Sequence, residues 1–184
     1  MDRKDFLKSA ARACVACAGV KVLSGQENRP DSAQTEKERQ ARAAEQQFKE
    51  AYILTLMQNM EKEIDGKTRT RLMERCGRAC ARRGSLYDRA RELKGDLDGF
   101  LKAMAGVLGK ENVVRNGDVI TWGYPRCFCE LVAGGPARLP DTYCLCSVGW
   151  VHEMFETVSQ KPVRVELLQS VKRGATSCKF LIRL

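Results

Sequence analysis

Apolar residues recur at helical spacing through the first half of the chain, with polar residues between them. From about Asp31 the apolar positions repeat every four residues, which is typical of an amphipathic helix that turns one face to a core. Asp65-Gly66 is expected to end this long helix. Its expected core positions are Phe48, Tyr52, Leu56, Met60 and Ile64, with Ile53 and Met57 beside them.

Two further helices are predicted before the pattern changes. The first runs from about Thr68 to Arg82 and the second from about Leu86 to Val107, with Gly84-Ser85 between them. The expected apolar face of the first is formed by Leu72, Cys76, Ala79 and Cys80. In the second, the expected inward positions are Leu86, Leu93, Leu97, Phe100, Leu101, Met104 and Leu108.

From Asn112 onward, apolar and polar residues alternate in short runs, which indicates strands. Residues 113–122 predict a hairpin with a type I′ turn at Asn116-Gly117. A short helix capped by Ser147 is expected through about Ser159, followed by strands at 163–167 and 178–182. The pattern predicts an α+β fold, with N-terminal helices (37–108) packed on a small antiparallel sheet with one inserted helix (111–184). Residues 37–184 would then form a single domain.

Two Cys-x-Cys pairs stand in this second half, Cys127-Phe128-Cys129 and Cys144-Leu145-Cys146. Residues two apart point to the same side of a strand. Because Gly134-Gly135-Pro136 predicts a turn between them, the pairs are expected to face each other across a hairpin. Facing Cβ atoms on paired strands lie about 4.5–5.5 Å apart, so four sulfurs would gather on one face of the sheet.

Three chemistries are compatible with such a group of thiols. Four thiolates at about 2.3 Å from a central ion hold zinc or an iron–sulfur cluster. Facing pairs can instead oxidise to disulfides, or the thiols can pack as small apolar groups. The final strand adds one more thiol, so the candidate metal ligands are Cys127, Cys129, Cys144, Cys146 and Cys178.

The helix predicted near residues 68–82 carries two more candidate groups. Cys76 and Cys80 are four residues apart and lie one above the other, either as additional ligands or as buried small residues. The same predicted helix carries a stripe of arginines at helical spacing, which form either a solvated face or an anion-binding site: Arg71, Arg75, Arg78 and Arg82. No aromatic residues or nucleic-acid motif accompany these arginines, so a nucleic-acid partner is disfavoured.

Composition narrows the classes of function. The chain has 184 residues, enough for one domain with extensions, and a net charge of +9. Residues 67–94 hold ten basic and three acidic residues, a local +7. Nine cysteines exceed the number that cytosolic enzymes usually carry. The single histidine, His152, excludes a His-rich metal site and is expected to face solvent, beyond hydrogen-bond reach of Cys146.

The first residues resemble an export signal. Arg3-Lys4-Asp5-Phe6-Leu7-Lys8 is similar to the twin-arginine pattern Arg-Arg-x-Phe-Leu-Lys, and the short apolar run 13–20 contains a small-residue cleavage site, Ala16-Cys17-Ala18. That run is far shorter than the roughly 20 residues of a membrane span. We therefore expect residues 1–23 to be a signal or an N-terminal helix and residues 24–36 a linker. The protein is exported if the signal works and cytoplasmic otherwise.

The C-terminal part carries a family resemblance. An ordered series of residues resembles the 4-vinyl reductase-like ligand-binding domains and the L-2-amino-thiazoline-4-carboxylic acid hydrolase-like family: Cys146-Ser147-Val148-Gly149-Trp150, Phe155, Lys161-Pro162-Val163-Arg164-Val165-Glu166, Gly174 and Cys178-Lys179-Phe180. The first family implies a small-molecule pocket between sheet and helices, with a cysteine-ligated zinc beside it. Cys146 and Cys178 match its ligand positions, and Ser170 stands where a further cysteine is often found. The second family implies the opening of a small sulfur- or nitrogen-containing ring.

Three functions remain open at this point. The first is a small-ligand and metal-binding protein with zinc or an iron–sulfur cluster. The second is a cysteine hydrolase with Cys146 or Cys178 as nucleophile, which requires a thiol of low pKa. The third is an exported, disulfide-stabilised protein without catalysis.

Overall fold

The computed structural model describes residues 36–132 and 138–184, which belong to one unit running from Glu36 to Leu184. The expected export signal and all but the last residue of the expected linker lie outside the described residues. Among the described helices, none combines the length and the apolar character that crossing a membrane requires.

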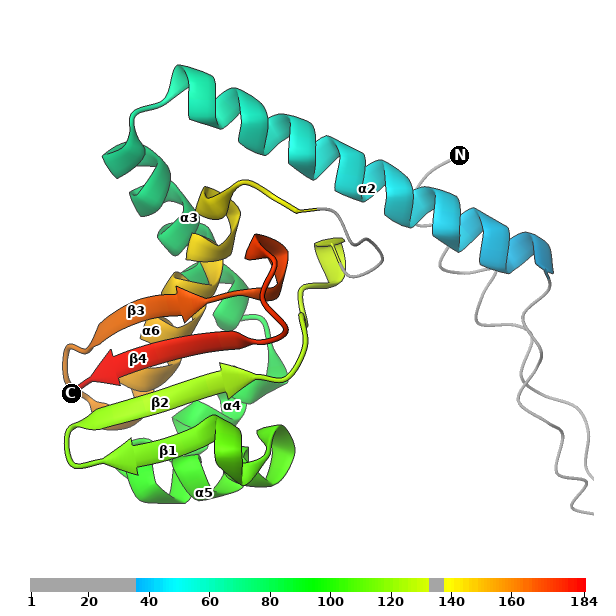
Figure 1. Ribbon diagram of the computed structural model, residues 1–184. Helices are drawn as coiled ribbons and strands as arrows, with labels where there is room; N and C mark the ends of the chain where they lie inside the picture. The colour runs from blue at the N-terminus through cyan, green and yellow to red at the C-terminus, as the bar shows by residue number, and fades with distance from the viewer. Residues whose placement is uncertain (1–35, 133–137) are drawn as a thin grey trace, which may run out of the picture. The chain divides into compact units, whose positions relative to one another are not determined.

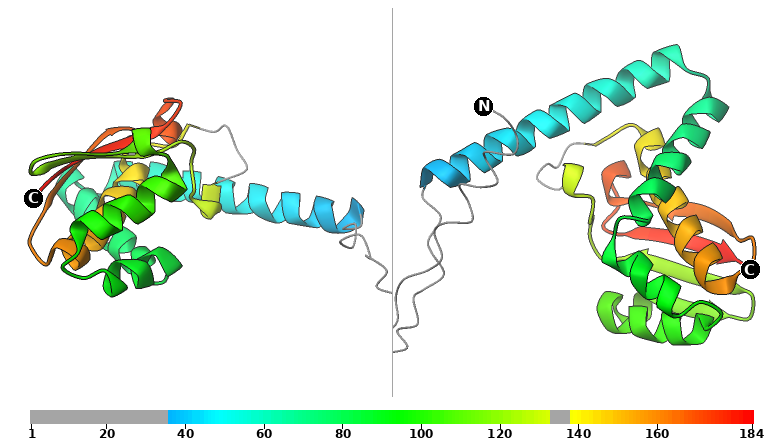
Figure 2. Two further views of the ribbon diagram at one scale, coloured as in Figure 1. Left: turned by 90° about the horizontal axis from the view of Figure 1, so that it is seen from below. Right: turned by 180° about the vertical axis from the view of Figure 1, so that it is seen from behind.

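Helices precede and flank one small antiparallel sheet, which confirms the predicted α+β class (Figure 1). The strands are β1 (Val113–Asn116), β2 (Val119–Tyr124), β3 (Arg164–Gln169) and β4 (Cys178–Arg183). Their order in the sheet is β1-β2-β4-β3 with every neighbouring pair antiparallel, so β1 and β3 are the edges. The inserted helix α6 (Leu145–Ser159) connects β2 to β3, and Figure 2 shows α5 and α6 on the same side of the sheet.

The helical half is divided differently from the prediction. The structure forms α2 (Glu36–Glu63), α3 (Gly66–Ala81), α4 (Ser85–Glu92) and α5 (Leu97–Leu108). Asp65 caps α3 by accepting a hydrogen bond of 3.0 Å from the N–H of Thr68. The single helix predicted over 86–107 is wrong, because Gly95 has a φ of 86° and interrupts it. Asp96 then caps α5 through the N–H of Gly99 at 2.9 Å.

The predicted hairpin, inserted helix and two final strands are present, but two details were wrong. The register pairs Asn116 with Val119, which leaves Gly117 and Asp118 as the turn. Only Gly117 has a positive φ, whereas a type I′ turn requires two such residues in a row. Helix α6 starts at Leu145, so Ser147 lies inside its first turn and does not cap it.

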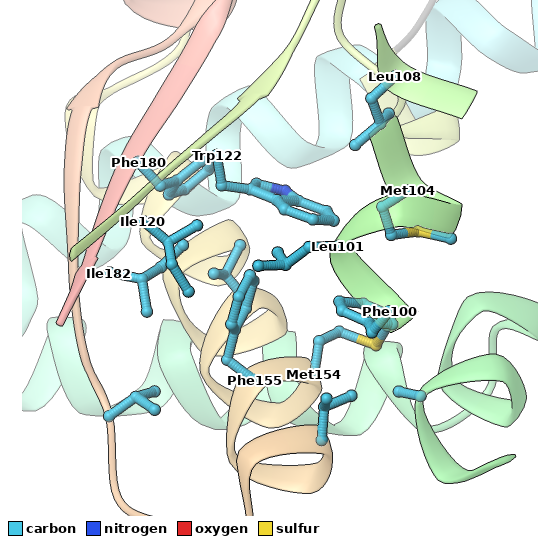
Figure 3. Packing of buried hydrophobic residues seen from close by; sticks show 14 of the residues in the cluster. Phe100, Leu101, Met104, Leu108, Ile120, Trp122, Met154, Phe155, Phe180 and Ile182 are labelled. Atoms are coloured by element: carbon cyan, nitrogen blue, oxygen red, sulfur yellow. The ribbon is translucent and has the colours of Figure 1, made fainter. Parts of the chain in front are cut away.

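The main core lies between the sheet and the helices α5 and α6 (Figure 3). Three fully buried aromatic rings form its centre. Phe100 stacks on Trp122 with ring centroids 6.0 Å apart, and Phe155 packs edge-on against Trp122 at 5.2 Å. These rings bury large apolar areas and fix α5 and α6 to the sheet.

The inward face predicted for α3 was wrong, and that predicted for α2 was right for Ile53, Met57 and Met60 but wrong for its first residues. Phe48 and Tyr52 are 72% and 60% exposed, and the residue of α2 that is buried is Met57. In α3 the buried residues are Met73, Gly77 and Ala81, while Cys76 and Cys80 are exposed. In both helices the apolar repeat specified a helix correctly, but a second set of apolar or small positions faces the domain.

Candidate metal site at the cysteine cluster

The two Cys-x-Cys pairs do not lie on paired strands. Cys127 and Cys129 lie between β2 and the short 3₁₀ helix η3 (Glu130–Val132). Cys144 ends a second 3₁₀ helix, η4 (Asp141–Cys144), and Cys146 lies in the first turn of α6. The predicted cysteine hairpin is therefore wrong, because the chain after Pro140 coils into helix instead of remaining extended.

The thiols nevertheless gather on one side of the domain, by a different route. Cys144 is buried in a second apolar cluster with Met57, Met73 and Tyr143. Cys127, Cys129 and Cys146 are partly buried and pack against the same cluster. Cys178, at the start of β4, packs against the main core instead, but it is close enough to Cys144 and Cys127 for their charges to act on it. We call these five residues, Cys127, Cys129, Cys144, Cys146 and Cys178, the cysteine cluster.

Hydrogen bonds from neighbouring residues connect the three chain segments that carry these thiols. Ser170 donates to Cys144 Sγ at 3.2 Å, and the N–H of the next residue, Val171, donates to Cys178 Sγ at 3.5 Å. Tyr143 Oη and Cys129 Sγ share a hydrogen bond of 3.0 Å. These bonds link Cys129 to η4, and they link Cys144 of η4 and Cys178 of β4 to the adjacent residues Ser170 and Val171. Ser170, the position at which the resemblance expects a cysteine, lies inside this group and is 1% exposed.

The environment disfavours thiolates in the metal-free protein. Burial raises the pKa of Cys146 to about 12, and the charges of Cys129 and Cys144 add to this effect. Burial also raises the pKa of Cys144, although the hydrogen bond from Ser170 opposes it. The pKa of Cys178 is raised by burial as well, against the hydrogen bond from Val171. These thiols therefore stay protonated at neutral pH unless a cation binds.

The i, i+4 pair on α3 does not join the cluster as a unit. Cys76 and Cys80 are both exposed. A charge on Cys80 contributes to the raised pKa of Cys146, so Cys80 borders the cysteine cluster. Nothing in the described contacts connects Cys76 to it.

Half of the arginine stripe binds carboxylates of the protein itself. Arg82 donates to Glu153 at 2.7 and 3.0 Å, and Arg78 donates to Glu156 at 2.6 Å and to Glu153 at 3.3 Å. These bonds join α3 to α6 and leave Arg78 and Arg82 committed within the fold. Arg71 and Arg75 are exposed and form no ion pair with a carboxylate of the described residues, so they are the members of the stripe left as candidates for an external anion.

The prediction that His152 faces solvent was wrong. The side chain is half-buried beside Arg78. Its Nδ1 lies 2.9 Å from the Arg78 guanidinium, and its Nε2 accepts a hydrogen bond of 3.2 Å from the N–H of Val165. Both neighbours carry donors, which disfavours the doubly protonated imidazolium; in the neutral ring, Nε2 is the acceptor for Val165. Burial lowers the pKa of His152, and the charge of Arg78 lowers it further. Neither contact is to a cysteine.

In the described part of the chain, no three His, Cys, Asp or Glu side chains already have the arrangement that a metal ion requires. The seven described cysteines are all free thiols, including Cys76 and Cys80. The disulfide alternative therefore receives no support from the residues that the structure describes. A metal would have to draw the sulfurs of the cysteine cluster closer together.

One open surface depression lies away from the thiols. It encloses about 1010 Å³ between α4 and α6 and is lined by charged residues such as Arg91, Glu153 and Lys161, with no cysteine among them. The space between sheet and helices, where the resemblance expects a small molecule, is filled by Phe100, Trp122 and Phe155. The geometry therefore favours the thiols, and not a preformed pocket, as the chemical site.

A comparison with protein-family models matches residues 16–184 to a family of unknown function, DUF6144. The chain belongs to this family. A comparison with curated proteins found no match. The family model extends over the whole described region and therefore includes all five members of the cysteine cluster.

Of the residues that hold the site in place, sequence reasoning singled out Ser170 through the resemblance and missed the others. Gly77 and Gly149 allow α3 and α6 to touch backbone to backbone, and Tyr143 and Ser170 bond to cysteine sulfurs. Two glycines at buried helical positions were the only sequence indication of such a close crossing. The contacts of Tyr143 and Ser170 join residues that are 14 and 26 positions from their partners, which no local pattern encodes.

Proposed function

We propose that this protein binds a metal, either zinc or an iron–sulfur cluster, through thiolates of the cysteine cluster. The observation that supports this function is the linkage of sulfurs from three separate chain segments by the adjacent residues Ser170 and Val171 and by Tyr143. A site made of thiolates is the donor set that zinc and iron–sulfur clusters prefer.

A metal accounts for the burial of several thiols better than a catalytic nucleophile does. A nucleophilic cysteine needs a lowered pKa and a nearby base. Burial instead raises the pKa of Cys146, although that residue lies in the first turn of a helix. The one histidine is engaged by Arg78 and Val165. A bound cation would favour the thiolate over the thiol, because it stabilises thiolates directly and couples their deprotonation to folding.

The residues proposed to hold the metal have distinct roles. Cys144 and Cys146 come from η4 and α6, which packing fixes, and Cys178 comes from a sheet strand. Cys127 and Cys129 lie on the segment that leaves β2. When bound, the metal would stabilise this end of the domain by joining helix, strand and loop. If the export signal is functional, a route that carries folded, cofactor-loaded proteins fits this role.

The proposal is tested by elemental analysis of protein purified natively under anaerobic conditions. We expect about one zinc per chain, or iron with acid-labile sulfide and a visible absorption band. Cys146→Ser should lose most of the metal, while Cys76→Ser, a change at an exposed thiol away from the cluster, should retain it. A protein that is isolated without metal, and that binds neither added zinc nor a reconstituted cluster, would contradict the proposal.

A gain-of-function variant gives an independent test. Ser170→Cys adds a thiol beside Cys144 at a buried position that already bonds to sulfur. We expect tighter zinc binding, measured by competition with a chromogenic chelator. Ser170→Ala, which removes the hydroxyl without adding a thiol, is the matched control and should not tighten binding.

A further inference from the structure

Helix α2 carries two apolar faces, and only one of them packs on the domain. Met57 is 3% exposed and packs with Ile53 and Met60 in the second apolar cluster. Phe48 lies nine residues earlier, which at about 100° per residue places it on the opposite side of the helix, roughly 180° from Met57. This second face continues through Tyr52 and Leu56.

The second face is exposed along its length. Phe48, Tyr52 and Leu56 are 72%, 60% and 40% exposed. We call these three residues the outer stripe of α2. A contiguous exposed row of large apolar side chains is typical of a surface that binds another protein or a membrane. A helix of 28 residues in which Met57 alone is buried also gains little stability from the rest of the domain.

We propose that the outer stripe binds the same stripe of a second copy of this chain, with the two α2 helices antiparallel and centred on Glu50. In this register Phe48 packs against the partner's Tyr52. Ala44 faces the partner's Leu56, so a small side chain lies opposite a large one at each end of the contact. Such alternation lets two helix faces interdigitate at close distance.

The charges at the two ends of α2 favour this arrangement. Lys37 falls opposite the partner's Glu63, and both are exposed. The two positions lie roughly 80° apart around the helix: Lys37 is next to Phe48 at one edge of the outer stripe, and Glu63 is in line with the stripe, between Tyr52 and Leu56. A parallel, in-register pair would instead set Lys37 against the partner's Lys37. Opposite charges on or beside the contact face select the orientation of paired helices.

Analytical ultracentrifugation of the full-length chain over a concentration series tests the proposal. We expect a reversible dimer, with Phe48→Glu shifting the equilibrium to monomer. The matched control is Val107→Glu, which places the same charge at an apolar residue of α5 that is 69% exposed and should leave the dimer intact. Circular dichroism verifies that both variants remain folded. A full-length chain that stays monomeric, for example because residues 1–35 cover the stripe, would overturn the proposal.

A charge reversal tests the antiparallel register itself. Lys37→Glu should weaken the dimer roughly tenfold, because it sets like charges together at both ends of a two-fold contact. Adding Glu63→Lys to the same chain restores an opposite pair at each end and should recover the affinity. A dimer whose dissociation constant responds to neither the single nor the double change would overturn the register. The metal content of the cysteine cluster is not a readout here, so the two proposals fail independently.

Discussion

Gly77 on α3 lies directly against the backbone carbonyl of Cys146 on α6, at a distance that leaves no space for a Cβ atom. Gly149 on α6 faces the carbonyl of Glu74 on α3 in the same way. This reciprocal contact lets the two helices cross backbone to backbone. It also places Cys146 beside the rest of the cysteine cluster, so the crossing supports both the fold and the candidate site.

We predict that Gly77→Ala destabilises the protein by about 2–3 kcal/mol, at the upper end of overpacking penalties. The added methyl group must push the backbone of Cys146 away, since backbone atoms cannot rotate out of its path. The shift in the midpoint of urea unfolding measures this change. The same displacement should reduce metal retention by the cysteine cluster.

Gly106→Ala in α5 is the matched control for Gly77. A Cβ atom at Gly106 meets no atom within 4 Å, so only helix propensity changes. The substitution should stabilise the protein by roughly 0.5–1 kcal/mol. If both glycine variants gave the same shift, the close crossing of α3 and α6 would be refuted.

Glu153 should make stability depend on pH in the acidic range. Burial alone raises the pKa of Glu153, but the hydrogen bonds and charges of Arg82 and Arg78 outweigh it, so the pKa lies below its ordinary value of 4.5. The unfolded chain therefore takes up this proton first as pH falls. The stability that the Glu153 carboxylate adds to the folded state is complete above about pH 4.5, and it is lost as the pH falls through the lowered pKa.

Glu153→Gln tests this dependence by removing the charge and keeping the shape. At pH 7 we expect a loss of about 1–2 kcal/mol, because the charge-assisted bonds from the two arginines are weakened. The difference from the wild type should disappear in strong acid, where the wild-type carboxyl is also protonated. Glu92→Gln removes an exposed partner of Arg89 and should cost less than about 0.5 kcal/mol.

His152 should make the stability of the fold depend on pH in a higher pH range than Glu153 does. Burial and the charge of Arg78 lower its pKa below 6.5, although Glu156 and Glu74 oppose them. Because the unfolded histidine binds a proton first, stability should decrease as pH falls below about 6.5, and His152→Gln should remove this part of the dependence. As the single histidine of the chain, its imidazole titration is directly assignable by NMR. A measured pKa at or above 6.5 would contradict the described contacts.

Thiol reactivity should separate the buried and exposed cysteines. In metal-free, reduced protein at pH 8, Cys146 should react with iodoacetamide at least about a hundredfold more slowly than Cys76, because thiolate is the reacting form. Burial raises the pKa of Cys146 to about 12, whereas Cys76 is exposed. Peptide mapping by mass spectrometry measures both rates in one sample. Fast labelling of Cys146 would instead favour the nucleophile alternative.

The residues 113–124 and 164–183 show how much of the fold local patterns determine. Their alternation of apolar and polar side chains specified strands, and Gly117 and Gly174 specified turns with positive φ. The helices α2 and α3 were likewise predicted by their apolar repeat, whereas α4 and α5 were predicted as one helix. Periodicity depends on the geometry of the backbone within one element, so it can be read without knowledge of neighbouring elements.

The cysteine pairs show what local patterns could not determine. A spacing of two places both thiols on one side only if the chain is extended, and Cys144 and Cys146 lie on helical turns instead. The thiols still converge, because η4, α6 and β4 bring them together through packing and through the bonds of Ser170, Val171 and Tyr143. The grouping was predicted, but its geometry was not.

By itself, the sequence determined the α+β class and the positions of most elements, and it singled out the thiols that we propose as ligands. Only the tertiary structure decided which face of α2 is buried, that Arg78 and Arg82 bind Glu153, and that Gly77 sets the position of Cys146. The physical reason is that local interactions do not distinguish the alternatives: either apolar face of a helix could be buried, and an arginine could bind any of several carboxylates. The choice between them depends on long-range contacts that no short stretch of sequence contains.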